Sequence, residues 1–154
     1  MDDLKRTLTG YPNLCETRFS EPRLNISVVF TSTESTLAAL KKADALASSL
    51  GACITLVVAQ KVPFPLPLDE PPVSGRWNED RLGRLAGDCP LNTTVNIFLC
   101  RDRLETLRSV LPSGSIVVVG CRNQRWFSME ARLARALRRI GHEVILTPVE
   151  RKNA

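Results

Sequence analysis

The sequence predicts an α/β protein with a doubly wound, three-layer arrangement around a five-stranded parallel sheet. Five short runs of the chain are almost continuously apolar and rich in β-branched residues, and helical patterns lie between most of them. Such strands are typical of parallel sheets that are covered on both faces, because neither face meets water. A length of 154 residues, 44% of them hydrophobic, suits one domain with a single core.

The chain divides into an arm and a regular domain. Residues 1–24 show no sustained hydrophobic period and contain Gly10, Pro12 and Pro22, so we expect them to form a loose or docked N-terminal arm. The α/β domain is expected over residues 25–150.

The domain begins with a predicted strand over residues 25–31, a compact run of β-branched and aromatic side chains. Apolar residues then recur at helical spacing up to Gly51, which predicts a helix that ends at this glycine. A second strand is predicted over residues 52–60. The apolar positions of the helix are Leu37, Leu40, Ala43, Ala47 and Leu50.

The next stretch carries five prolines between residues 63 and 72. Proline lacks a backbone N–H and does not fit the interior of a helix or a central strand, so this stretch predicts a long surface loop. It is either a rigid spacer of polyproline-like conformation or an interaction motif. A short helix is expected over residues 78–87.

The second half of the domain repeats the strand and helix pattern. Residues 93–100 predict a third strand, and a helix follows in which Asp102 and Glu105 have the spacing of a capping box. Residues 115–120 predict a fourth strand. The last helix is expected over 128–141, with Met129, Leu133, Ala136, Leu137 and Ile140 toward the sheet, and the last strand over 142–149.

The cysteines and the histidine give little support for catalysis. The five cysteines are scattered, odd in number and free of C-x-x-C spacing, so we expect reduced thiols and no zinc site. Cys121 is expected to be a buried small side chain, although nearby arginines could favour its thiolate. His142, the only histidine, has no partner for a metal site or a nucleophile–base pair, so it is expected to be a hydrogen-bonded residue at the start of a strand.

No segment indicates membrane insertion or export. The longest apolar runs are far shorter than the roughly 18 residues of a membrane span, and the N-terminus has acids and no apolar h-region. A cytoplasmic location is therefore expected.

Two segments, residues 28–58 and 115–149, together with the proline-rich excursion after the second strand, resemble the universal stress protein family. The likeness covers residues 25–149, and a similar domain occurs at the cytoplasmic end of some potassium-sensor kinases. The resemblance implies a sheet in the order 3-2-1-4-5, as in the adenine nucleotide alpha hydrolase-like fold. It also implies a homodimer built through the last strand, residues 142–149, which is an apolar run at a sheet edge.

The resemblance also implies where a nucleotide would bind. ATP-binding members of the family have an aspartate, a glycine and a serine after the first strand, and these fall on Thr31, Ser32 and Thr33. Their loop after the fourth strand has two glycines and a final glycine–serine pair. Gly120 matches the first glycine and Asn123 replaces the second, while the shorter loop brings Glu130 and Ala131 to the final pair.

These replacements predict that ATP no longer binds, so no cofactor is expected. A carboxylate at Glu130, near the first turn of the last helix, supplies the negative charge that a phosphate would otherwise bring. The alternative is an ATP- or AMP-binding protein in which Arg122 and Arg125 clamp the phosphates with their forked donors. A nucleotide hydrolase is a second alternative, as some relatives of the fold are.

The positive charge is concentrated near the end of the chain. The net charge of +5 is carried entirely by residues 120–142, and the rest of the chain has equal numbers of bases and acids. On the last helix, Arg132, Arg135, Arg138 and Arg139 predict an outward basic stripe that meets an acidic protein partner. Nucleic acid is an unlikely partner, because no aromatic residues alternate with the arginines. We therefore expect a non-enzymatic, dimeric adaptor domain.

Overall fold

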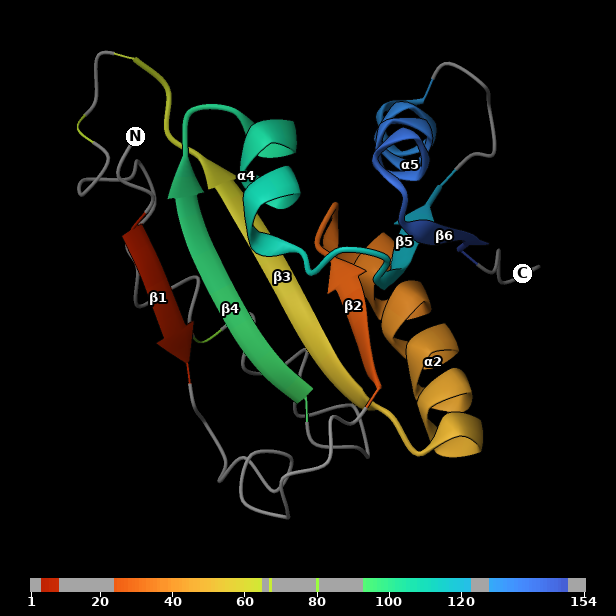
Figure 1. The fold of residues 1–154 in the computed structure, drawn as a ribbon. Helices are drawn as coiled ribbons and strands as arrows, with labels where there is room; N and C mark the ends of the chain where they lie inside the picture. The colour runs from red at the N-terminus through yellow and green to blue at the C-terminus, as the bar shows by residue number, and fades with distance from the viewer. Residues whose placement is uncertain are drawn as a thin grey trace, which may run out of the picture.

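The computed structural model describes residues 4–8, 24–64, 67, 80, 93–122 and 128–149, and the backbone alone for residues 4–8. Within these residues one six-stranded sheet is packed against helices (Figure 1). In sheet order the strands are β1 (Leu4–Leu8), β4 (Thr93–Cys100), β3 (Cys53–Lys61), β2 (Asn25–Val29), β5 (Ile116–Cys121) and β6 (Glu143–Pro148). The helices are α2 (Thr33–Leu50), α4 (Arg103–Val110) and α5 (Met129–Ile140).

The five strands from β4 to β6 in this order run parallel to one another. They are the five predicted strands, and their order confirms the expected 3-2-1-4-5 arrangement. The boundaries agree with the predicted ranges to within two residues at each end.

β1 is a sixth strand that was not predicted. It runs antiparallel to β4, with Leu4 opposite Leu99 and Leu8 opposite Val95. Its sequence, Leu-Lys-Arg-Thr-Leu, has no clear strand pattern, and the pairing comes from the unfilled hydrogen-bonding edge of β4. The beginning of the expected arm therefore extends the sheet.

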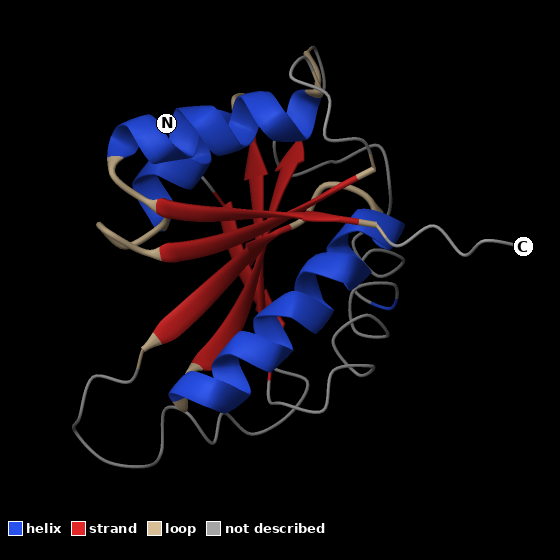
Figure 2. Ribbon diagram, turned by 90° about the vertical axis from the view of Figure 1, so that its right-hand side faces the viewer, coloured by secondary structure: helices blue, strands red, loops and turns tan. Residues whose placement is uncertain are grey.

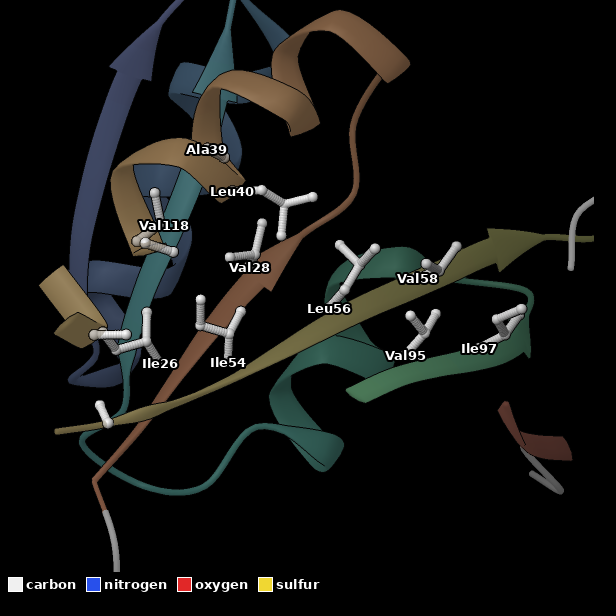
Figure 3. Close-up of a cluster of buried hydrophobic side chains, with 13 residues drawn as sticks. Ile26, Val28, Ala39, Leu40, Ile54, Leu56, Val58, Val95, Ile97 and Val118 are labelled. Atoms are coloured by element: carbon white, nitrogen blue, oxygen red, sulfur yellow. The ribbon is translucent and has the colours of Figure 1, made fainter. Parts of the chain in front are cut away.

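Helices cover both faces of the sheet (Figure 2). On one face, Ala39 and Leu40 of α2 pack over alternate residues of the central strands, such as Val28 and Leu56 (Figure 3). On the other face, Leu107 of α4 and Leu137 of α5 pack over the intervening residues, including Val119. This alternation explains why the strands are nearly continuously apolar in sequence.

Side chains and glycines fix the helix ends. Ser32, Asp102 and Ser128 are the N-cap residues of the three helices, and each accepts a hydrogen bond from a first-turn N–H. Asp102 accepts from the Glu105 N–H at 2.9 Å, which is one half of the predicted capping box. α2 ends at Gly51, as predicted, with a left-handed φ of 64°.

Two predictions about single side chains were wrong. Met129 was expected to face the sheet but is 56% exposed, because it is the first residue of α5 and the buried positions are Ala134 and Leu137. Cys53 was expected to be a free thiol but is disulfide-bonded. Cys100 and Cys121 are free and buried.

Most of the proline-rich stretch 63–72 and of the expected short helix 78–87 falls outside the described residues. These predictions stay untested.

Candidate functional site at the carboxyl ends of β2 and β5

The direction of winding reverses between β2 and β5, which are neighbours in the centre of the sheet. In doubly wound sheets, ligands bind beyond the carboxyl ends of the two strands at this reversal. The residues that follow β2 and β5 are therefore the candidate site, and most of the predicted nucleotide-binding positions lie there.

Thr31 joins the ends of the two strands. Its Oγ1 donates a hydrogen bond to the carbonyl oxygen of Gly120 at 3.3 Å, and its backbone N–H donates to Oγ1 of Thr36 at 3.3 Å. At the position where the resemblance implies an aspartate, this chain thus has a hydroxyl that is already bonded within the protein.

Ser32 and Thr33 belong to the start of α2. Ser32 is the N-cap: its Oγ accepts from the Ser35 N–H at 3.3 Å, and its carbonyl accepts from the Thr36 N–H at 2.8 Å. Thr33 is the first residue of the helix. The amides of Ser35 and Thr36 are therefore bonded to oxygens of Ser32.

Gly120 has a packing role that is independent of any ligand. It is buried in β5, and a Cβ at this position would lie 1.8 Å from the carbonyl oxygen of Ser35 and 2.4 Å from its carbon. Only glycine lets the first turn of α2 approach β5 this closely. The one glycine that matches the family loop is thus required by the fold itself.

Arg122, just after β5, forms an ion pair with Glu34 in the first turn of α2. Its Nη2 lies 2.9 Å from Oε2 of Glu34, and the two side chains are 65% and 64% exposed. An exposed pair of this kind contributes roughly 0–1 kcal/mol. Glu34 was not predicted as a site residue. The available signal was its place in the first turn of the helix after β2, since this turn and the end of β5 meet at the same end of the sheet.

The start of α5 is also bonded within the chain. Oγ of Ser128 accepts from the Ala131 N–H at 3.1 Å, so this amide, at the position of the family's final serine, already has an acceptor. Glu130 lies in the first turn, where a carboxylate interacts favourably with the helix dipole.

Burial and the charge of Glu130 both affect the pKa of Cys121, at the end of β5. Burial raises the pKa of the Cys121 thiol, and the nearby Glu130 carboxylate raises it further. The alternative of a favoured thiolate is therefore wrong, and Cys121 is the expected buried thiol. Asn123 and Arg125, the remaining candidate nucleotide contacts, fall outside the described residues.

The four arginines of the predicted stripe do not have the same surroundings. Arg132 and Arg139 are exposed, and Arg135 is half-buried. Nη2 of Arg138 donates to the carbonyl oxygen of Val144 in β6 at 2.9 Å. Arg138 therefore ties α5 to the edge strand.

One further arrangement at this end of the sheet was missed. The guanidinium of Arg101, after β4, lies 4.1 Å from the ring centroid of Phe64, after β3, and its Nη1 donates to the Val62 carbonyl at 2.8 Å. Phe64 is 81% exposed. Its position next to several prolines hid it in the sequence.

His142 is the hydrogen-bonded strand-entry residue that was expected. It is buried, and its Nδ1 accepts from the Ser115 N–H at 3.3 Å. Among the residues that the structure describes, no three His, Cys, Asp or Glu side chains gather to hold a metal ion. None of the described helices combines the length and hydropathy that crossing a bilayer requires.

Comparison with solved structures finds proteins of similar fold. The chain is similar to a protein of the universal stress protein family from Burkholderia pseudomallei, with a TM-score of 0.53 and 20% identity over 80% of this chain and 95% of that one. It is also similar to a universal stress protein in complex with cAMP, with a TM-score of 0.47 and 19% identity over 84% of this chain and 100% of that one. No family model and no curated protein matches the sequence. The first likeness confirms the fold that the resemblance implied.

Proposed function

We propose that this chain is a cytoplasmic, non-enzymatic regulatory domain of the universal stress type, which acts through protein contacts and does not hold ATP. The observation that carries the proposal is the set of internal contacts between β2 and β5. The Thr31 hydroxyl donates a hydrogen bond to the Gly120 carbonyl, and Arg122 forms an ion pair with Glu34. Two candidate nucleotide positions, Thr31 and Gly120, thus contact each other, and a third, Arg122, is paired with an acid.

Electrostatics at the two helix starts supports the same proposal. A helix N-terminus attracts anions, and a first-turn acid there gains about 0.3–1 kcal/mol. Glu34 occupies this place in α2 and Glu130 in α5. A triphosphate entering between the strands would meet both carboxylates, and it would compete with Glu34 for Arg122.

Calorimetry with ATP and Mg²⁺ tests this proposal. We expect no binding heat from the wild-type protein in the micromolar range, and no hydrolysis product in a parallel assay. Micromolar binding that is lost in Arg125→Ala would show that arginines have replaced the glycine amides, and it would favour the ATP- or AMP-binding alternative. Turnover of ATP would favour the hydrolase.

We also propose that two copies of the chain pair through the open edge of β6. The N–H groups of Glu143 and Val149 donate to the carbonyls of Ser115, just before β5, and of Cys121 at its end. Backbone groups of a strand alternate in direction, so Val144, Leu146 and Pro148 direct theirs to the open edge. These three residues would form the dimer contact.

The chemistry of this edge is self-complementary around Leu146. In an antiparallel pair with a two-fold axis at Leu146, Val144 lies opposite Pro148 of the second copy. Proline has no N–H to donate, and the Val144 carbonyl that would accept from it already accepts from Arg138. Two copies joined in this register would leave none of these backbone groups without a partner.

A further inference from the structure

We propose that β1 is an exchangeable strand: the Leu4–Leu8 segment of a second copy of this chain can take the place of β1 on the edge of β4. Two copies that exchange this segment form a strand-swapped dimer. The inference concerns the edge of the sheet that lies farthest from β6. It depends neither on the absence of ATP binding nor on pairing through β6.

β1 is an addition to a sheet that is complete without it. The five strands from β4 to β6 are parallel and form the doubly wound arrangement, whereas β1 is antiparallel and pairs with β4 alone. It lies at the outer edge of the sheet and packs chiefly against β4 (Figure 1). A strand that is held by one ladder at an edge opens at a lower free energy than a central strand.

Without β1, β4 would be an unprotected edge strand. An uncovered edge offers a row of backbone N–H and C=O groups to any extended chain, and an apolar edge is the most prone to such pairing. The occupant that the structure shows is Leu4–Leu8, so the same segment of a second copy has the same pairs to form. The buried apolar residues of β4 opposite this segment are Val95, Ile97, Phe98 and Leu99.

The connection between β1 and β2, residues 9–24, is long enough for both arrangements. β1 and β2 are three strand spacings apart in the sheet, or about 14 Å. A chain of this length can span up to about 50 Å. The segment can therefore reach its own β4 without strain, and it can also reach the β4 of a neighbouring copy.

Protein concentration decides between the two arrangements. A connection of this length holds the segment near its own β4 at an effective concentration in the millimolar range. The exchanged arrangement forms the same backbone pairs and gains only from the presence of a second copy. We therefore expect monomers with β1 in place in dilute protein, and more exchange as the concentration rises.

Mutual exchange stops at two copies. Each β4 edge is then filled and each β1 is used, so the arrangement is a closed, two-fold symmetric dimer. The sequence of β1 includes Lys5 and Arg6. Charged residues on an edge strand discourage the addition of a further chain, which protects the outer edge of β1 against growth into a fibre.

Cysteine cross-linking tests the exchange. Thr7 of β1 lies opposite the half-buried Asn96 of β4. A Thr7→Cys variant is mixed with an Asn96→Cys variant, with oxidised glutathione as the oxidant. The introduced cysteines can form a disulfide only where β1 of one copy lies on β4 of the other. We expect a covalent dimer whose yield rises with protein concentration, and peptide mapping should find the bond between the two introduced cysteines.

Two controls define the background. Lys41 is exposed on α2, so Thr7→Cys mixed with Lys41→Cys measures cross-linking by random collision. We expect at least about tenfold more dimer with Asn96→Cys, because ladder pairing brings the two Cβ atoms within disulfide reach. In the double variant Thr7→Cys/Asn96→Cys, dilute protein should form the bond within one chain, and this locked protein should form no dimer with either single variant.

Pairing through β6 does not produce the same bond, because it places the two β4 edges at opposite ends of the joined sheet. A dimer yield equal to that of the Lys41→Cys control would overturn the exchange, and so would a dimer linked through any other residue. If circular dichroism shows that Asn96→Cys is not folded, photoreactive benzoylphenylalanine replaces Thr7 in the otherwise wild-type chain. The photo-cross-linked dimer should then map to residues 95–99, and a dimer that maps elsewhere would contradict the proposal.

Discussion

At Gly120 the end of β5 passes so close to the first turn of α2 that any side chain would overlap the backbone of Ser35. This contact sets the position of α2, and with it the positions of Thr31, Ser32 and Glu34. The same glycine matches the family's nucleotide loop. Its presence is therefore explained by packing, and it gives no support for phosphate binding.

Gly120→Ala should destabilise the fold by at least about 2 kcal/mol, because a methyl group 1.8 Å from a carbonyl oxygen forces the helix and the strand apart. Chemical denaturation measures the free energy of unfolding. Gly114→Ala is the control: it has open space around its Cβ but a φ of 68°, so it should lose only about 1 kcal/mol. A smaller loss at Gly120 than at Gly114 would contradict the close approach.

The raised pKa of Cys121 gives a second prediction for a single residue. At neutral pH the thiol is protonated in both the folded and the unfolded chain. As the pH rises above about 8.5, the unfolded chain loses this proton first, so the folded state binds more protons and stability falls with pH. Cys121→Ala should remove this part of the alkaline loss, and Glu130→Gln should reduce it.

Denaturation series at several alkaline pH values measure the slope of stability against pH for the three proteins. The absolute stability of Cys121→Ala is not informative here, since it also loses packing. Identical slopes in wild type and Glu130→Gln would show that the Glu130 carboxylate does not act on the end of β5.

Sequence could not reveal the partners of these residues. The hydroxyl at Thr31 and the acid at Glu34 are visible in sequence, but their contacts with Gly120 and Arg122 span nearly ninety residues of chain. Such pairs form only when two strand ends meet in the folded sheet. The favourable interaction of the Glu130 carboxylate with the helix dipole could be predicted from sequence, because it depends only on a position in the first turn of α5.

At the scale of elements, sequence predicted what hydrophobic period alone determines. The five parallel strands and the helices α2, α4 and α5 all bury apolar residues at a regular spacing, and all were found. β1 was missed because its pairing with β4 depends on backbone hydrogen bonds, and Met129 was misplaced because periodicity does not show where a helix passes beyond the core.

The edge strand β6 gives a prediction that depends on its backbone. If the dimer forms around Leu146, its outward N–H is donated to the second copy, and Leu146→Pro should abolish the dimer by removing that donor. Leu146→Ala is the control, because it also shortens the side chain but keeps the N–H. Sedimentation velocity should show monomers for the proline variant and dimers for wild type and the alanine variant.

If Leu146→Pro and Leu146→Ala were both monomeric, the dimer would depend on the Leu146 side chain, and backbone pairing would be contradicted. A wild-type protein that is monomeric at all concentrations would remove the dimer altogether. Because Leu146 N–H faces away from β5, Leu146→Pro should leave the sheet of the monomer intact, which far-ultraviolet circular dichroism checks.

At the scale of the whole molecule, the proposed dimer contact, the open edge of β6, lies beyond β5 from the reversal point between β2 and β5. α5 packs beside this edge, since Arg138 bonds to the Val144 carbonyl. The carboxyl ends of the central strands, where the fold usually takes its ligand, are connected by internal contacts. We therefore expect partners to bind the outer surface of the domain, and not the carboxyl ends of β2 and β5.

A crystal structure determined from protein grown with ATP and Mg²⁺ tests this account most directly. The account predicts no nucleotide density beside Thr31 and Gly120, with the Thr31 hydroxyl still bonded to the Gly120 carbonyl and Arg122 still paired with Glu34. Adenosine polyphosphate bound between β2 and β5, with Glu130 turned away from the end of β5, would contradict it.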